Sequence, residues 1–212
     1  MNTKVFAAGT ASIMLTVALV VAPTAAADSP DLLAGITVAP YQHRYDYRRA
    51  AFGEGWGEDA GGCDLRDDVL NRDLVDKTYV SVKRCPEAVA TGTLNDPYTG
   101  KTIAFTRGAR SSEAVQIDHV VPLSYAWDMG AWSWTDQQRQ RFYLDPAELL
   151  AVDGPTNQAK GDAPPGRWMP PNTAFDCQYA IIFTSVLRAY GLPIDSGSVP
   201  VLQHAAASCP AA

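Results

Sequence analysis

A secretory signal followed by four cysteines is the feature that most restricts how this chain can fold. Residues 1–27 have the layout of a signal peptide, with Lys4 ahead of an apolar run from Ile13 to Val21 and three alanines at the cleavage point. Cleavage after Ala27 would leave a mature chain of 185 residues (212 minus 27). We therefore expect residues 28–212 to form one secreted domain without stable membrane association.

A retained membrane anchor is the alternative for the same segment. The apolar stretch begins near Val5, but Gly9, Thr10 and Ser12 interrupt it. It therefore falls well short of the ~20 apolar residues that a transmembrane helix needs. No cysteine follows the signal directly, so lipid attachment at that point is not expected.

Export places the four cysteines in an oxidising environment, where disulfides are the default. Four cysteines allow three pairings, and we favour Cys63–Cys85 with Cys177–Cys209 because each of these pairs closes a moderate local loop. A zinc site made by all four thiolates is the alternative, but the sequence contains no C-x-x-C spacing. Each disulfide would restrict the unfolded chain and so stabilise the domain.

Local patterns indicate an α+β domain. A cluster of turn-forming residues at 95–100 separates two β-type runs at 91–94 and 101–105, which predicts a β-hairpin. Apolar periodicity and capping residues predict further elements: helices at 64–74, 124–129, 135–142, 175–190 and 199–207, and strands at 115–121 and 149–152. The second of these strands leads through a turn at 153–156 into another helix start.

Asp118 and His119 are the strongest candidates for chemistry in this pattern. They lie near the end of a β-type run and are followed by the rigid Pro122. Adjacent residues of a strand point to opposite faces, so two neighbours can share one site only where the strand ends or bends. A second strand and the helix start that carries Asn157 follow downstream, and the other two histidines have no comparable setting.

These residues carry a resemblance to a known family. The segment from Val115 to Leu123, with Leu149–Val152 and Asn157–Asp162, resembles the HNH endonucleases. It is more closely similar to exported proteins related to the C-terminal nuclease domain of GmrSD-type restriction enzymes. Further matching pieces extend the resemblance over about residues 30–190: Cys63–Arg66, Asp96–Gly100, Ala126–Ala131 and Trp168–Pro171.

The resemblance implies a ββα-metal (His-Me finger) core at about residues 113–165, in which two strands and a helix hold one divalent cation. By matching position, His119 would be the general base, and Asp118 and Asn157 would be the protein ligands of the metal. A neutral imidazole can accept a proton at neutral pH, and a carboxylate with an amide oxygen suits Mg²⁺ or Mn²⁺. We expect these three side chains to converge, with the His119 ring open to solvent.

Three further positions are candidates for supporting roles. The middle position of the HNH pattern, usually an asparagine that braces the loop bearing the base, is Glu148, which could brace that loop, bind metal or mark an impaired enzyme. Lys160 lies one helical turn after Asn157 and could contact substrate phosphate. The alternative is that Lys160 is an ordinary lysine on the helix surface. Arg66 is a second candidate for phosphate contact, and a salt bridge to a nearby aspartate is its alternative.

The predicted function is a secreted endonuclease that is monomeric and cleaves DNA in preference to RNA with little sequence specificity, since no base-reading element is evident. The net charge of −6, or −7 once Lys4 leaves with the signal, is unusual for such an enzyme because phosphate contacts supply most non-specific affinity. A cation and a local basic strip would have to offset it. Candidate strips, each of which could equally be solvated surface charge, are His43–Arg49, Lys83–Arg84 and Arg107–Arg110.

Two other functions stay open. The acidic charge and Glu148 are also compatible with a catalytically inactive, secreted binding module on an HNH scaffold. Another exported hydrolase, for example one acting on cell-wall material, is disfavoured because the sequence has no serine nucleophile elbow, no H-E-x-x-H motif and no recognisable pair of catalytic carboxylates.

Overall fold

Helices and short strands alternate along the chain, and the predicted α+β class is confirmed. The computed structural model describes Met1 and residues 31–58, 60–108 and 111–210, so the predicted signal peptide lies outside the described residues apart from Met1. The strands are β1 (Val38–Ala39), β2 (Leu74–Val82), β3 (Cys85–Asn95), β4 (Thr102–Thr106), β5 (Val115–His119), β6 (Leu149–Asp153) and β7 (Ile194–Asp195). The α-helices are α1 (Leu65–Asp73), α2 (Leu123–Asp128), α3 (Asp136–Tyr143), α4 (Gly154–Lys160), α5 (Asp176–Tyr190) and α6 (Ser198–Ala206). Short 3-10 helices are η1 (Arg49–Ala51), η2 (Ser111–Ala114), η3 (Ala131–Ser133) and η4 (Thr173–Phe175).

Strands β5 and β6 pair antiparallel, and helix α4 follows β6 directly, so the predicted order of strand, strand and helix is present. His119 at the end of β5 lies opposite Leu149 at the start of β6. The turn into α4 needs glycine at position 154, because a Cβ there would lie 2.1 Å from the carbonyl oxygen of Glu113. Asp153 caps the helix by accepting a hydrogen bond from the Thr156 amide at 2.9 Å.

The predicted hairpin is part of a larger sheet of three antiparallel strands in the order β2-β3-β4. The hairpin prediction was thus correct but incomplete, because β2, which the β-branched and aromatic residues of its sequence favour, extends it. Asp96 holds the turn between β3 and β4 by accepting a hydrogen bond from the Thr99 amide at 2.8 Å. Its other carboxylate oxygen accepts a hydrogen bond from the Asp153 amide at 2.9 Å, which ties this turn to the end of β6.

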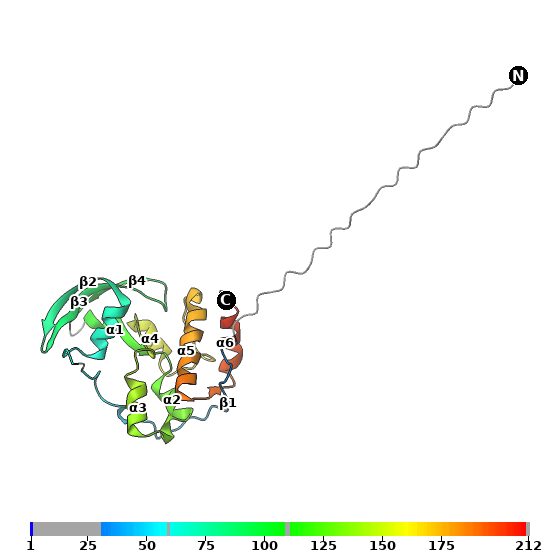
Figure 1. The fold of residues 1–212 in the computed structure, drawn as a ribbon, viewed down its shortest axis with the longest axis horizontal. Helices are drawn as coiled ribbons and strands as arrows, with labels where there is room; N and C mark the ends of the chain where they lie inside the picture. The colour runs from blue at the N-terminus through cyan, green and yellow to red at the C-terminus, as the bar shows by residue number, and fades with distance from the viewer. Residues whose placement is uncertain (2–30, 59, 109–110, 211–212) are drawn as a thin grey trace.

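The β5–β6–α4 unit lies between the two ends of the molecule. Figure 1 shows the β2–β4 sheet with α1 at one end, α5 and α6 at the other, and α4 between them. The hydrophobic core is divided in the same way, because one cluster gathers around α1 and β3 and the other around α2, α5 and α6. Successive residues of β6 face different clusters: Ala151 packs in the first and Val152 in the second.

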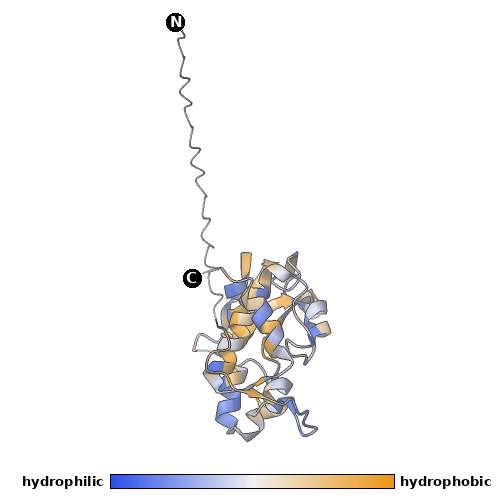
Figure 2. Ribbon diagram, turned by 90° about the vertical axis from the view of Figure 1, so that its right-hand side faces the viewer, coloured by the Kyte–Doolittle hydropathy of each residue, from blue (hydrophilic) through white to orange (hydrophobic). Residues whose placement is uncertain are grey.

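Colouring by hydropathy shows hydrophobic and hydrophilic residues alternating along individual helices, as expected for helices that bury one face (Figure 2). Among the described residues, no helix combines the length and the apolar character needed to cross a membrane.

Helix α1 covers the free edge of β6 with side chains instead of a further strand. The guanidinium of Arg72 donates a hydrogen bond to the carbonyl of Leu149 at 2.7 Å, and Asp73 accepts one from the Ala151 amide at 2.9 Å. These contacts satisfy backbone groups that an open edge would leave exposed.

Both predicted disulfides are confirmed. Cys63–Cys85 links the segment ahead of α1 to the start of β3. Cys177–Cys209 links the first turn of α5 to the residues that follow α6. The two disulfides therefore cross-link the chain at opposite ends of the molecule.

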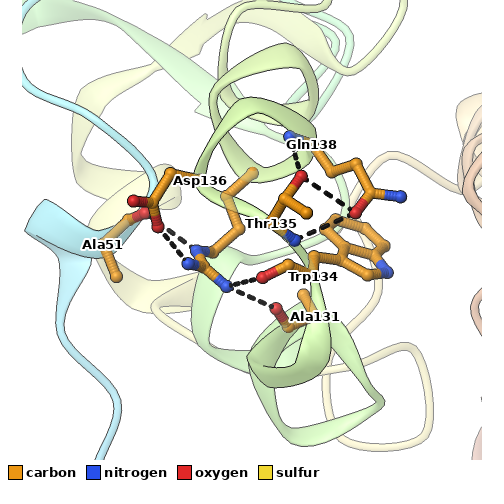
Figure 3. Close-up of polar contacts among 7 residues, drawn as sticks. Ala51, Ala131, Trp134, Thr135, Asp136 and Gln138 are labelled. Atoms are coloured by element: carbon orange, nitrogen blue, oxygen red, sulfur yellow. Dashed lines mark hydrogen bonds and ion pairs between the residues drawn. The ribbon is translucent and has the colours of Figure 1, made fainter.

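The segment ahead of α1 has little regular structure and is fixed by side chains from α3. Arg139, whose side chain is 11% exposed, donates hydrogen bonds to the backbone carbonyls of Ala51, Ala131 and Trp134 and pairs with Asp136. The same helix begins with a capping box formed by Thr135 and Gln138, and Figure 3 shows how these contacts surround the start of α3. Arg139 therefore fastens the N-terminal segment to the helical part of the domain.

We expect Arg139→Ala to lower the free energy of unfolding by roughly 2–3 kcal/mol, because it removes the arginine donor from the partly buried carbonyl groups of Ala51 and Trp134. Asp136→Ala is the matched control: it removes the ion pair of Arg139, but the Asp136 side chain is 96% exposed, so a much smaller loss is expected. Urea unfolding with the disulfides intact measures both. Equal losses for the two variants would contradict the assigned role of the carbonyl contacts.

Candidate active site

A cavity of about 400 Å³ lies where β5 ends and α4 begins. Asp118 and His119, the last two residues of β5, line it together with Asn157 from α4. The structure thus brings the three predicted site residues to one space. Further lining residues that matter for charge and access are Arg49, Trp56, Arg66 and Gln116.

The imidazole of His119 is largely enclosed by aromatic rings. Its centroid lies 5.1 Å from that of Tyr143 and 6.2 Å from that of Trp56, and both rings are nearly parallel to it. His119 is only 6% exposed, so the expectation of a ring open to solvent was wrong: the ring meets solvent only through the cavity. The sequence analysis did not identify Trp56 as a neighbour of His119, because the two residues lie far apart in the sequence.

The contacts of His119 fix which ring nitrogen holds the proton. Nε2 lies 3.0 Å from the carbonyl oxygen of Tyr143, and because a carbonyl can only accept, Nε2 donates this hydrogen bond. Nδ1 forms no hydrogen bond with any described residue, so it is left as an acceptor. Burial, with Arg49 and Lys160 acting in the same direction, lowers the pKa of His119 to about 3, while the Tyr143 carbonyl opposes the shift. The ring is therefore neutral at neutral pH.

Asp118 is buried and held by two donors. Its Oδ2 accepts hydrogen bonds from the Tyr98 hydroxyl at 2.5 Å and from the Lys160 ammonium at 2.6 Å. Burial raises the pKa of Asp118, and the contacts with Lys160 and Tyr98 oppose that shift. The carboxylate is thus oriented from the protein side, which leaves Oδ1 without a partner among the described residues.

Lys160 lies inside the domain and is only 2% exposed. Besides its ion pair with Asp118, its ammonium donates a hydrogen bond to the carbonyl of His119 at 2.7 Å. The alternative of a helix-surface lysine was therefore wrong. Contact with substrate phosphate stays a prediction, and the observed partners are the two neighbouring site residues.

Asn157 is oriented by a residue that the sequence did not single out. Its side-chain nitrogen donates a hydrogen bond to the Oε1 atom of Gln116 at 2.9 Å, which leaves the Asn157 Oδ1 atom available to an outside partner. Gln116 lies two positions before Asp118 on β5. Its position in the strand was the available signal, because residues two apart in a strand share a face.

Glu148 connects the start of β6 to the loop that follows His119. Its carboxylate oxygens lie 3.0 and 3.2 Å from the Val121 amide nitrogen, which donates to them, and its backbone carbonyl accepts from the Val120 amide at 2.9 Å. Glu148 is fully buried, and burial raises its pKa well above the ordinary value. Of its three proposed roles, loop bracing is the one for which the structure supplies contacts.

Arginines bring positive charge to the cavity. Arg66 donates a hydrogen bond to the carbonyl of Val115 at 3.1 Å, and burial lowers its pKa. Arg49, from the predicted strip His43–Arg49, lies with its guanidinium 5.7 Å from the Tyr143 ring centroid. In the other strips, Arg84 pairs with Glu58 and Arg107 with Asp67, while positions 109 and 110 lie outside the described residues.

Fold and site together define a mixed α+β domain whose cavity combines a carboxylate, a neutral imidazole and an amide. Residues 64–188 match the family model described as the C-terminal domain of GmrSD restriction endonucleases, and the chain belongs to this family. It is also 37% identical over 187 residues to a protein of Arthroderma benhamiae described as an uncharacterized secreted protein, a match that covers 87% of this chain and 86% of the relative. No solved structure matches the chain. The secreted relative and the two disulfides confirm the predicted secretion.

Two variants of Glu148 test its contact with the loop. We expect Glu148→Ala to lower the free energy of unfolding by about 1–3 kcal/mol, because the Val121 amide loses its acceptor in a buried place. Glu148→Gln keeps an acceptor there and should lose much less. Similar losses for both variants in urea unfolding would contradict the hydrogen-bonding role.

The same pair predicts a pH dependence. Because burial raises the pKa of Glu148 in the folded state above its ordinary value of 4.5, the unfolded state releases this proton first as the pH rises. The stability that protonated Glu148 contributes is then lost from about pH 4.5 upwards. The stability of Glu148→Gln relative to the unmodified protein should therefore increase with pH over this range, and parallel pH profiles would contradict the raised pKa.

Proposed function

We propose that this protein is a secreted, metal-dependent endonuclease that hydrolyses phosphodiester bonds, acting on DNA in preference to RNA and with little sequence specificity. The observation that carries the proposal is the single cavity lined by Asp118, His119 and Asn157. Membership of a restriction-endonuclease domain family supports a nuclease. The strand–strand–helix order of β5, β6 and α4 is the arrangement that a ββα-metal core requires.

The donor set fits a hard divalent cation. Asp118 and Asn157 each present one oxygen without a partner among the described residues, and their other polar atoms are held by Lys160, Tyr98 and Gln116. Across the part of the chain that the structure describes, no group of three or more His, Cys, Asp and Glu side chains is suited to a metal. One carboxylate and one amide oxygen favour Mg²⁺ or Mn²⁺, with water and phosphate oxygens as the other ligands. When bound, such a cation supplies positive charge to the phosphate and the leaving oxygen.

His119 serves as the general base in this proposal. Its Nδ1 atom is unprotonated and accepts a proton from the attacking water. Nε2 keeps its own proton and donates a hydrogen bond to the Tyr143 carbonyl. The rings of Trp56 and Tyr143 hold the imidazole in place, and burial keeps it neutral before the reaction. The neighbouring carbonyl of Tyr143 can stabilise the cationic ring that follows proton transfer.

Substrate would be held mainly through its backbone. Arg49 and Arg66 line the cavity and supply charge for phosphate oxygens, which offsets the net charge of −6 locally. Contacts of this kind carry no sequence information, which supports low specificity. Lys160 acts in this proposal through Asp118, by orienting the carboxylate and balancing its charge.

The central test is cleavage of plasmid DNA by the purified mature protein with Mg²⁺ or Mn²⁺. We expect His119→Ala to slow cleavage about 10²–10⁴-fold, because general base catalysis is lost. His204→Ala, which changes an exposed histidine on α6, is the matched control and should retain activity.

A parallel assay with RNA measures the substrate preference, and EDTA should abolish cleavage. If His119→Ala cleaved DNA at the rate of the unmodified protein, His119 would not be the general base. A folded protein that binds nucleic acid but does not cleave any would instead be the inactive binding module.

Gln116 should affect metal binding more than the chemical step. Gln116→Ala removes the hydrogen bond that orients Asn157, so the metal concentration for half-maximal cleavage should rise about 10–100-fold, with most of the rate recovered at saturating metal. Gln203→Ala, on the exposed surface of α6, is the control. An unchanged metal requirement in Gln116→Ala would show that Asn157 does not depend on this contact.

A further inference from the structure

A second cavity, of about 450 Å³, adjoins the candidate active site. Its lining residues include Tyr41, His43, Lys160, Asp162 and Arg167. Two of these connect it to the first cavity: Asp162 lines both spaces, and Lys160 lines the second while its ammonium bonds to Asp118 of the first. The two cavities are therefore neighbours.

Arg167 brings an available positive charge to this second cavity. Its side chain is exposed, and its guanidinium lies 5.0 Å from the centroid of the Tyr41 ring. No described carboxylate lies within ion-pair distance of it. Contact with one tyrosine orients a guanidinium and uses only part of its several N–H donors, so others are available to an anion. Asp162, which also lines the cavity, is exposed to solvent, so its repulsion is screened.

His43 is positioned at the same cavity by a buried carboxylate. Its Nδ1 atom lies 3.1 Å from the Oδ2 atom of Asp128, whose side chain is fully buried and also accepts a hydrogen bond from the Arg44 amide at 2.8 Å. The His43 side chain itself is 52% exposed. Asp128 thus fixes the ring while leaving it accessible to a ligand.

We propose that this second cavity is a phosphate subsite for the nucleic-acid strand on one side of the bond that is cleaved, with Arg167 as the phosphate contact. The proposal rests on the proposed endonuclease function. An oriented guanidinium is suited to an oxyanion, and a polyanionic strand presents one such group per nucleotide. Tyr41 and His43 precede the residues that match the family model, so part of this subsite comes from the segment that Arg139 fastens.

The test measures binding of fluorescently labelled, single-stranded DNA oligonucleotides of increasing length by anisotropy. His119→Ala serves as the background, so that the oligonucleotides stay intact. Adding Arg167→Ala should weaken the binding of longer oligonucleotides about tenfold, because a charge-assisted hydrogen bond is lost. It should also reduce the slope of log affinity against log salt concentration by about 0.7, the value for one phosphate contact on a single strand.

Arg141→Ala is the matched control, because it removes the same charge from the exposed face of α3 at a different cavity. Arg167→Lys should keep most of the salt dependence. If Arg167→Ala had the same affinity for oligonucleotides and the same salt dependence as Arg141→Ala, the proposed subsite would be wrong. This result is distinct from failure of the proposed function, which shows as absent plasmid cleavage by the unmodified protein.

Discussion

The buried ammonium of Lys160 connects the two elements on which the candidate site depends. Its hydrogen bonds to Asp118 and to the carbonyl of His119 join the end of α4 to the end of β5. A buried charge is costly unless it is paired, so the geometry in which these partners meet is strongly preferred over any in which they separate. Because Asn157 lies one turn earlier on the same short helix, the contact that anchors Lys160 also fixes where Asn157 stands relative to Asp118.

The loop beyond β5 is held by a second set of buried contacts. Glu148 accepts a hydrogen bond from the Val121 amide, and the Tyr143 carbonyl accepts one from Nε2 of His119. Both contacts come from the segment between the last residue of α3 and the start of β6, so one segment controls the position of the loop and the tautomer of the ring. The low-dielectric surroundings that make these contacts strong also raise the pKa of Asp118 and lower that of His119, so burial orients the groups and tunes them at once.

Sequence patterns were sufficient where local rules decide structure and insufficient where packing does. Apolar runs and a capped Asp-Gly-Pro turn predicted β5, β6 and α4, and loop lengths predicted both disulfides. The spacing of Lys160 from Asn157 showed which side of the helix it occupies, but not that this side faces a buried carboxylate. Trp56 could not be predicted for a further reason: its segment is irregular, and distant contacts such as those of Arg139 set the path of that segment.

The distribution of charge explains how an acidic chain can present a cavity suited to phosphate. Several carboxylates are engaged by arginines away from the site, as in the pairs Asp67–Arg107 and Asp73–Arg72. Arg49 and Arg66 instead line the first cavity, and their field acts across partly enclosed space where screening by solvent is weaker. Net charge describes the potential at a distance from the protein, whereas a bound phosphate responds to the few groups within contact range. A negative total is therefore compatible with two arginines that line the cavity, and the arrangement of the fold around the cavity determines which charged groups a bound phosphate would meet.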